Sequence, residues 1–318
     1  MKKILERLKR FGEILIKTYK QWNAREPFNN SIIIAYYTIF SLPGLLVIII
    51  NIAGYFFDKK DVTSEITSQI QAMIGGDTAK DIESIIDKAS SGKDTVISSI
   101  IAVATLLFGA TGVFYQLQQM LNKIWEVEPK AKEKGKILKL IRDRVFSFGL
   151  ILAVGFLMLV SLALSAMLSV FSTWVTTHLS ESLNIIFKFI DIVISVGVIT
   201  VLFAMIYKFL PDAKIHWSDV WRGALLTSIL FVITKFALGL YFGKSNPGSA
   251  YGAAGSIILI MLWVSYVGLI LLYGAEFTKV QTVQHGKKIK PTAVAVVAAG
   301  TSDNEAGVNK KKQRKDQP

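Results

Sequence analysis

The chain has 318 residues, of which 52% are hydrophobic, with a mean hydropathy of +0.46 and a formal net charge of +13. This composition is too apolar for an ordinary soluble domain and is typical of a protein that crosses a membrane several times. The sequence contains no cysteine, which excludes a disulfide framework and a thiolate metal site.

Residues 1–31 predict a basic amphipathic helix. Apolar residues recur every three or four positions from Ile4 to Trp22, and lysines and arginines occupy the other faces. Such a helix is expected to lie in the cytoplasmic headgroup layer, where it would contact anionic phospholipids. The alternative is a solvated helix packed against the rest of the protein.

Six apolar stretches follow, each long enough to carry a helix across a bilayer. The predicted spans are residues 32–57, 95–121, 146–171, 185–210, 221–243 and 252–277. The expected fold class is therefore all-α, a polytopic membrane helix bundle with six transmembrane helices in a membrane domain of residues 32–280. Residues 281–318 cannot bury a core and are predicted to form a disordered basic tail.

Residues 58–94, between the first two spans, are polar and acidic. Val62, Ile66 and Ile70 follow helical spacing, and Gly75-Gly76 separates them from a second, shorter pattern. We expect two amphipathic helices here, on the extracytoplasmic side.

The distribution of positive charge predicts the orientation. Of the 36 lysines and arginines, 28 lie in segments on one side of the predicted bundle and six on the other. Because positively charged loops stay in the cytoplasm, both termini are expected to be cytoplasmic. The positive charge then acts as a signal for membrane orientation and provides a surface that binds anionic lipids. No nucleic-acid partner is expected.

Two spans contain polar or helix-breaking residues that a substrate route could use. Pro43-Gly44 interrupts the first span, close to Ser41 and Asn51, and predicts a kink or a break that lines a pathway. Gln116 and Gln119 follow the second span. They could bind a substrate or pack between helices.

Lys235 lies about 14 residues into the fifth predicted span, roughly 21 Å from its cytoplasmic end. A charge at this depth is costly, so it is expected to snorkel, to pair or to face a cavity with an anionic ligand. Asp191 of the fourth span lies at a similar depth. A Lys235–Asp191 contact is therefore predicted.

Glu276 ends the sixth predicted span near the cytoplasmic face. It is expected either to form a structural ion pair or to act as a carboxylate linked to protons or cations. The basic residues expected at its level are Arg142, Arg144, Lys208 and Arg222. Asp219 is expected to cap the start of the fifth helix.

Tyr251, Gly252 and Gly255 lie at the outer start of the sixth span. The glycines allow close helix packing or the approach of a ligand to the backbone.

Several motifs carry a resemblance to a known family. They are AYYTIFSLPG at 35–44, FGATGVFYQLQQMLNKIWEV at 108–127, YKFLPD at 207–212, HWSDVWRG at 216–223, YGAAGS at 251–256 and YGAEF at 273–277. In this order and spacing they resemble the YihY family, also called the virulence-factor BrkB family and once labelled ribonuclease BN. The resemblance implies a bacterial inner-membrane protein with six helices, for which a transport role has been proposed.

The sequence distinguishes three classes of function: an enzyme, a transporter and a structural membrane protein. An enzyme is not expected, because His178, His216 and His285 lie in separate polar segments and no zinc, nucleophile or phosphate-loop motif is present. Ribonuclease activity is disfavoured for the same reason, and no cofactor is expected. A transporter or flippase for an anionic or zwitterionic, polar or lipid-like substrate is favoured by the intramembrane polar residues. The alternative is a structural or regulatory membrane protein, which needs none of them.

Overall fold

The computed structural model describes residues 2–55, 58–74, 78–80, 82–84, 96–130, 184–245, 247–292 and 294–298. The elements within them are helices α1 (Lys2–Asn23), α2 (Pro27–Ala53), α3 (Lys59–Ile74), α5 (Val96–Trp125), α7 (Asn184–Phe209), α8 (Trp217–Ser245) and α9 (Gly255–Gln284), the 3-10 helix η2 (Pro247–Ala254), and strands β1 (Val127–Pro129), β2 (Ala213–Lys214), β3 (Lys290–Pro291) and β4 (Ala295–Val297). The prediction of a mostly helical fold is confirmed, with short strands added.

Three segments in the described part of the chain are long and apolar enough to cross a membrane: Ile192–Phe209, Trp217–Phe242 and Gly255–Gln284. They coincide with the fourth, fifth and sixth predicted spans. The predicted third span, residues 146–171, lies outside the described residues. The number of six spans therefore stays a prediction.

Helix α8 exposes a continuous apolar stripe. Its large outward side chains are Leu225, Ile229, Ile233, Phe236 and Leu240, each 45–65% exposed. The stripe extends from Leu225 to Leu240, 15 helical steps or about 22 Å at 1.5 Å per residue. Water would not favour so long an exposed apolar surface, whereas hydrocarbon would. The stripe is what a lipid-facing helix requires.

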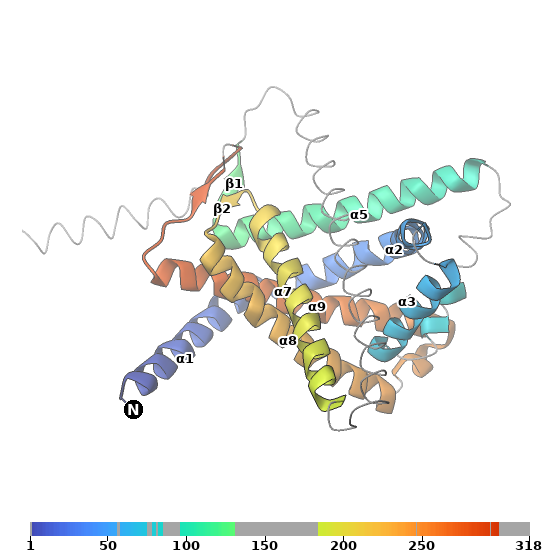
Figure 1. Cartoon of the computed structure of the whole chain (residues 1–318). Helices are drawn as coiled ribbons and strands as arrows, with labels where there is room; N and C mark the ends of the chain where they lie inside the picture. The colour runs from blue at the N-terminus through green and yellow to red at the C-terminus, as the bar shows by residue number, and fades with distance from the viewer. Residues whose placement is uncertain are drawn as a thin grey trace, which may run out of the picture.

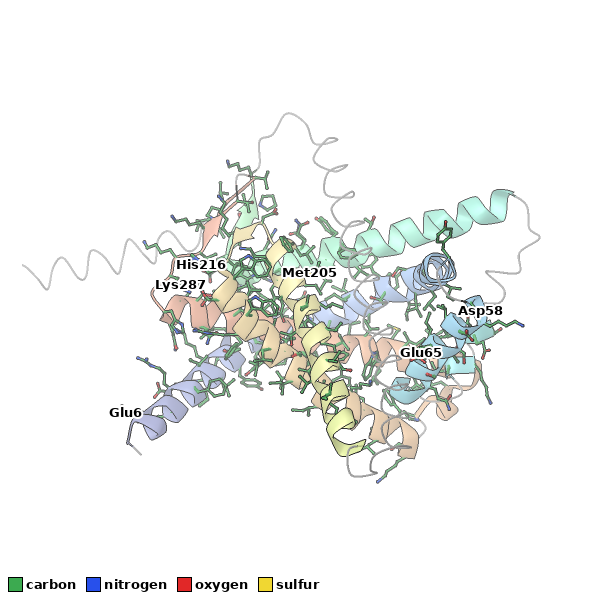
Figure 2. The ribbon with its side chains drawn as sticks, viewed as in Figure 1. Glu6, Asp58, Glu65, Met205, His216 and Lys287 are labelled. Carbon is green, nitrogen blue, oxygen red and sulfur yellow. The ribbon has the colours of Figure 1, made fainter. Side chains whose placement is uncertain are left out.

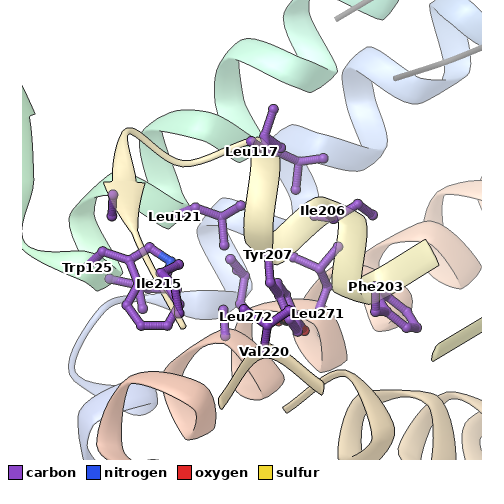
Figure 3. Close-up of a cluster of buried hydrophobic side chains, with 14 of the residues drawn as sticks. Leu117, Leu121, Trp125, Phe203, Ile206, Tyr207, Ile215, Val220, Leu271 and Leu272 are labelled. Carbon is purple, nitrogen blue, oxygen red and sulfur yellow. Dashed lines mark hydrogen bonds between the residues drawn. The ribbon is translucent and has the colours of Figure 1, made fainter. Parts of the chain in front are cut away.

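Helix α9 is the centre of the arrangement. It packs against α1, α2, α5 and α8, and Figure 1 shows it running through the middle of the bundle. One buried cluster joins it to α5, α7 and α8 through Leu121, Trp125, Tyr207, Val220 and Leu272 (Figure 3). A second cluster joins α2, α3, α8 and α9 towards the opposite end. These two cores fix the relative positions of the long helices.

Small residues bring α7, α8 and α9 unusually close. A Cβ on Gly223 would lie 1.7 Å from the Thr278 hydroxyl, and one on Gly274 would lie 1.8 Å from that of Thr227. Thr227 also lies 2.9 Å from the hydroxyl of Tyr207, which donates to the Leu271 carbonyl at 2.8 Å. Hydrogen bonds between helices that approach this closely stabilise packing inside a membrane.

Helix α2 continues without interruption through Pro43-Gly44, from Pro27 to Ala53. Figure 1 shows its last part almost end-on while the earlier part runs across the view, so the helix bends. The alternative of a break at this position is therefore wrong. The missing proline N–H is tolerated within a bent helix. Close to the bend, Gly109 of α5 packs against the backbone at Ser41, where a Cβ would meet the Ser41 nitrogen at 2.6 Å.

The polar segment after α2 contains the expected amphipathic helix. In α3, Val62 is buried, and Ile66 and Ile70 pack against the second core. Residues 78–80 and 82–84 are also helical, and Ile82 is buried. The two-helix interpretation is confirmed for the first helix. Gly75-Gly76, the predicted separator, lies outside the described residues.

The segment after α9 is ordered where disorder was predicted. β4 pairs antiparallel with β1, which follows α5, and β3 pairs antiparallel with β2, which lies between α7 and α8. Ala295 is buried. The prediction of a disordered tail from residue 281 is therefore wrong as far as residue 298, because backbone pairing orders a stretch whose small side chains offer little core. Residues 299–318 lie outside the described residues.

Candidate functional site

A four-membered charge cluster surrounds Glu276 near the end of α9. The Glu276 side chain is fully buried, with Arg25 Nε 3.0 Å from Oε2 and Lys279 Nζ 3.8 Å from Oε1. Glu126 completes the cluster, 2.6 Å from Lys279 Nζ and 3.4 Å from an Arg25 terminal nitrogen. Two acids and two bases balance one another. The cluster therefore carries no formal net charge.

Local backbone structure positions the members of this cluster. Arg25 lies in the tight turn between α1 and α2, where Glu26 has a φ of 52°, and Glu126 follows α5 with a φ of 58°. Left-handed backbone at non-glycine residues is uncommon and indicates that the surroundings enforce it. Arg25 also donates to the Lys123 carbonyl at 2.7 Å. It thus ties the α1–α2 turn to both α5 and α9.

The structural ion-pair interpretation of Glu276 is therefore supported, but Lys208 and Arg222, two of the basic residues expected near it, make other contacts. Lys208 donates to the Ile215 carbonyl and lies over the Trp217 ring, 5.4 Å from its centroid. Arg222 instead contacts His285, with 3.4 Å between nitrogens. Arg142 and Arg144 lie outside the described residues. Arg25 was missed because its segment appeared to belong to a surface helix.

Asp219 does not cap α8. The helix begins at Trp217, and the amide of Asp219 already donates to the His216 carbonyl at 3.0 Å. The Asp219 side chain is buried in the first turn, where it accepts from Lys287 Nζ at 2.8 Å. Figure 2 shows Lys287 and His216 at one end of the bundle and Asp58 and Glu65 at the other.

Lys235 lies on the packed side of α8. Helical spacing places it on the same face as buried Ser228 and Leu238, while the exposed stripe occupies another face. The side chain is half-buried and forms no hydrogen bond or ion pair with any residue in the described part of the chain. Asp191 belongs to α7, but its side chain lies outside the described set. The Lys235–Asp191 contact therefore stays a prediction.

The candidate site residues of the first two predicted spans belong to α2 and α5 and are far from Lys235 in the sequence. Ser41 is buried against α5 and donates to the Thr38 carbonyl at 3.0 Å. Gln116 and Gln119 are half-buried on α5. The side chains of Pro43, Gly44 and Asn51 are not among those described, although all three residues belong to α2.

Just before the start of α9, Tyr251 is 58% exposed on η2. A Cβ on Gly255 would lie 2.3 Å from the Gly248 carbonyl oxygen. The close-packing interpretation is confirmed for Gly255. The environment of Gly252 is not described.

One polar contact was missed by the motif analysis. The Asn122 amide donates to the Asp212 carboxylate at 3.0 Å, and the Asp212 backbone N–H donates back to the Asn122 carbonyl at 2.7 Å. Asp212 closes the YKFLPD motif, and Asn122 belongs to the FGATGVFYQLQQMLNKIWEV motif. The two motifs therefore meet in space, and these two hydrogen bonds join α5 to the α7–α8 link.

Within the described part of the chain, no three or more His, Cys, Asp or Glu side chains gather in a group that could hold a metal ion. The charge cluster pairs each acid with a base, so its carboxylates already have cationic partners.

Comparisons with known proteins agree with the fold. The family model described as Virulence factor BrkB matches residues 18–297. A UPF0761 membrane protein of Vibrio cholerae is 28% identical over 195 residues, covering 60% of this chain and 59% of the relative. One of Xanthomonas oryzae pv. oryzae is 24% identical over 247 residues, covering 76% and 54%.

The chain thus spans a little more than half the length of these relatives. No solved structure matches it. The family match covers most of the chain, including every described helix from α2 to α9, and the relatives bear the name of membrane proteins. This chain is an integral membrane protein of the BrkB family.

Proposed function

We propose that this protein moves an anionic or zwitterionic substrate, polar or lipid-like, across the bacterial plasma membrane. The proposal includes six spans with both termini in the cytoplasm, and no enzymatic step. The observation that carries it is Lys235. This cation lies in the middle of a membrane-length helix, on the packed face, without a polar partner among the described residues.

An unpaired ammonium group inside hydrocarbon costs several kcal/mol, so it persists where a counter-charge or water compensates it. A substrate phosphate or carboxylate would supply that counter-charge during passage. Asp191 would supply it between passages, because it lies nine residues before Thr200 on α7 and Lys235 lies seven after Ser228 on α8. Thr200 and Ser228 are hydrogen-bonded at 2.7 Å, which sets the two helices side by side at this level. Counting outward from this bond, Asp191 and Lys235 lie at a similar depth.

Reconstitution tests the transport role. Proteoliposomes containing NBD-labelled phosphatidylglycerol or phosphatidylethanolamine report movement between leaflets when dithionite is added. We expect Lys235→Met to slow the movement at least about tenfold, and Lys235→Arg to retain most of it. Lys244→Met is the matched control, because Lys244 is an exposed lysine at the outer end of the same helix. Equal flux for Lys235→Met and the unsubstituted protein would refute the role of Lys235.

The same experiment addresses the structural alternative. A scaffold would move neither lipid at any lipid-to-protein ratio, and Lys235→Met would leave its thermal stability unchanged or higher, because a half-buried cation without a polar partner among the described residues is removed. That pair of results would favour the non-transporting alternative.

The absence of cysteine makes the orientation easy to test. Ser68 is exposed on α3 and Gln284 is exposed at the end of α9, so each accepts a cysteine without loss of a core contact. A membrane-impermeant maleimide added to intact spheroplasts should label Ser68→Cys at once and Gln284→Cys only after permeabilisation. The reverse pattern would overturn the predicted sidedness.

A further inference from the structure

A groove of about 680 Å³ runs between α7 and α8. Its walls are apolar, with Ile192 and Val196 on α7 and Leu225 on α8. The two helices lie side by side at the front of the view in Figure 1. The volume is within the range of small-ligand sites, but the apolar walls suit a hydrocarbon ligand better than a polar solute.

The length of the α7 wall is close to the thickness of one leaflet. Its α7 wall extends from Ile192 to Val201, which is about 14 Å at 1.5 Å per residue. The hydrocarbon core of a bilayer is about 30 Å thick, so each leaflet contributes about half of that. Gly197 forms part of the wall, and a Cβ built there meets no atom of a described residue within 4 Å. Within the described part of the chain, the space beside Gly197 is therefore open.

A cation and an aromatic ring lie at the end of the groove. Arg222 and Trp221 line it near the start of α8, and both are exposed. The guanidinium contacts His285 and forms no ion pair with an acid in the described part of the chain. The nearby acid Asp219 is already paired with Lys287 at 2.8 Å. Tryptophan and arginine are typical of the membrane–water boundary, where lipid phosphates lie.

We propose that this groove binds one anionic phospholipid, with an acyl chain along α7 beside Gly197 and the phosphate on Arg222. Charge complementarity favours this occupant, because a guanidinium that has no acidic partner among the described residues can bind phosphate through two parallel hydrogen bonds. The inference deepens the proposed function and depends on it for one point, the assumption that lipid-like molecules are the substrate class. It is tested by binding alone, so a failure of transport and a failure of binding are distinguishable.

Native mass spectrometry of the full chain tests the site. The detergent-purified, delipidated protein is titrated with dioleoyl-phosphatidylglycerol and, separately, dioleoyl-phosphatidylcholine. We expect one molecule of phosphatidylglycerol to bind tightly to each protein molecule, and phosphatidylcholine to bind more weakly. Arg222→Gln should weaken phosphatidylglycerol binding at least about tenfold, which is the effect of losing a charge-assisted phosphate contact. Lys244→Gln, which removes an exposed cation at the other end of α8, should leave binding unchanged.

A second variant, Gly197→Phe, tests whether lipid binding needs the open groove. The new ring would occupy the groove without a backbone clash, so we expect lipid binding to fall about tenfold with thermal stability retained. Gly12→Phe is the matched control, because Gly12 is also a helical glycine with open space around its Cβ position. Unchanged lipid binding in Gly197→Phe would overturn the proposal. A large loss of stability would also overturn it, because it would show that protein from this chain or a second copy fills the groove.

Discussion

Replacing Arg25 by methionine tests the charge cluster most directly. The substitution removes the 3.0 Å contact to Glu276 and the 3.4 Å contact to Glu126, and it keeps a long apolar side chain in place. Glu276 would then stay fully buried with Lys279 at 3.8 Å, beyond hydrogen-bonding distance. Removing one partner of a buried ion pair costs about 3–5 kcal/mol, because the other charge is left uncompensated.

The side chain of Arg25 is 22% exposed, so we expect the lower end of that range, about 3 kcal/mol. For a chain of this size a loss of 1 kcal/mol lowers the Tm by about 2–4 °C, which predicts a fall of about 6–12 °C. The six tryptophans allow the Tm to be followed by intrinsic fluorescence in detergent. Lys20→Met, which removes an exposed cation from α1, is the control and should change the Tm by less than about 2 °C.

A double variant separates the loss of charge balance from the loss of packing. Arg25→Met combined with Glu276→Leu removes the uncompensated carboxylate and should recover most of the lost stability. Two results would show that the cluster does not hold the α1–α2 turn to α9. One is a Tm of the single variant within about 1 °C of that of the unsubstituted protein. The other is a double variant whose Tm is no higher than that of the single variant.

Three further substitutions test the packing and the hydrogen bonds. Gly223→Ala should prevent stable folding in a size-exclusion assay, because its Cβ would lie 1.7 Å from a hydroxyl, whereas Gly12→Ala should be tolerated; equal monodispersity of the two would contradict this. Asn122→Ala should lower stability by about 2 kcal/mol, because it removes two hydrogen bonds to Asp212, and an unchanged Tm would count against that contact. Ala295→Asp should speed proteolysis after α9, because this side chain is buried in the strand that pairs with β1, and an unaltered digestion pattern would show that the pairing is dispensable.

Hydrophobic runs were sufficient to locate the long helices that the structure describes, because span length is dictated by bilayer thickness. The fourth predicted span, 185–210, differs by one residue at each end from α7, Asn184–Phe209. The sixth, 252–277, differs more, since α9 begins at Gly255 and continues to Gln284. Its polar last turns stay helical because tertiary contacts with α1 bury Phe277 and Val280. Hydropathy alone contains no information about such contacts.

The candidate site was harder to predict because its members come from distant parts of the chain. Glu276 was identified from its position at the end of a span, and its burial bears out the expectation of an ion pair. Its partner Arg25 lies in a turn whose left-handed neighbour, Glu26, has no sequence signal. The pairing of β4 with β1 was missed for a related reason: two strands of three residues are too short for alternation to be recognised.

The two small strand pairs have a consequence for how the chain is made. β1 and β2 are synthesised long before the segments that pair with them, and their partners follow the last helix. The β2–β3 pair must therefore wait, with an open backbone edge, until residue 291 has left the ribosome, and the β1–β4 pair must wait until residue 297. Translation order places the closing of this surface after the synthesis of α9, so a ribosome stalled after α9 should leave the described long helices inserted and this surface unfinished.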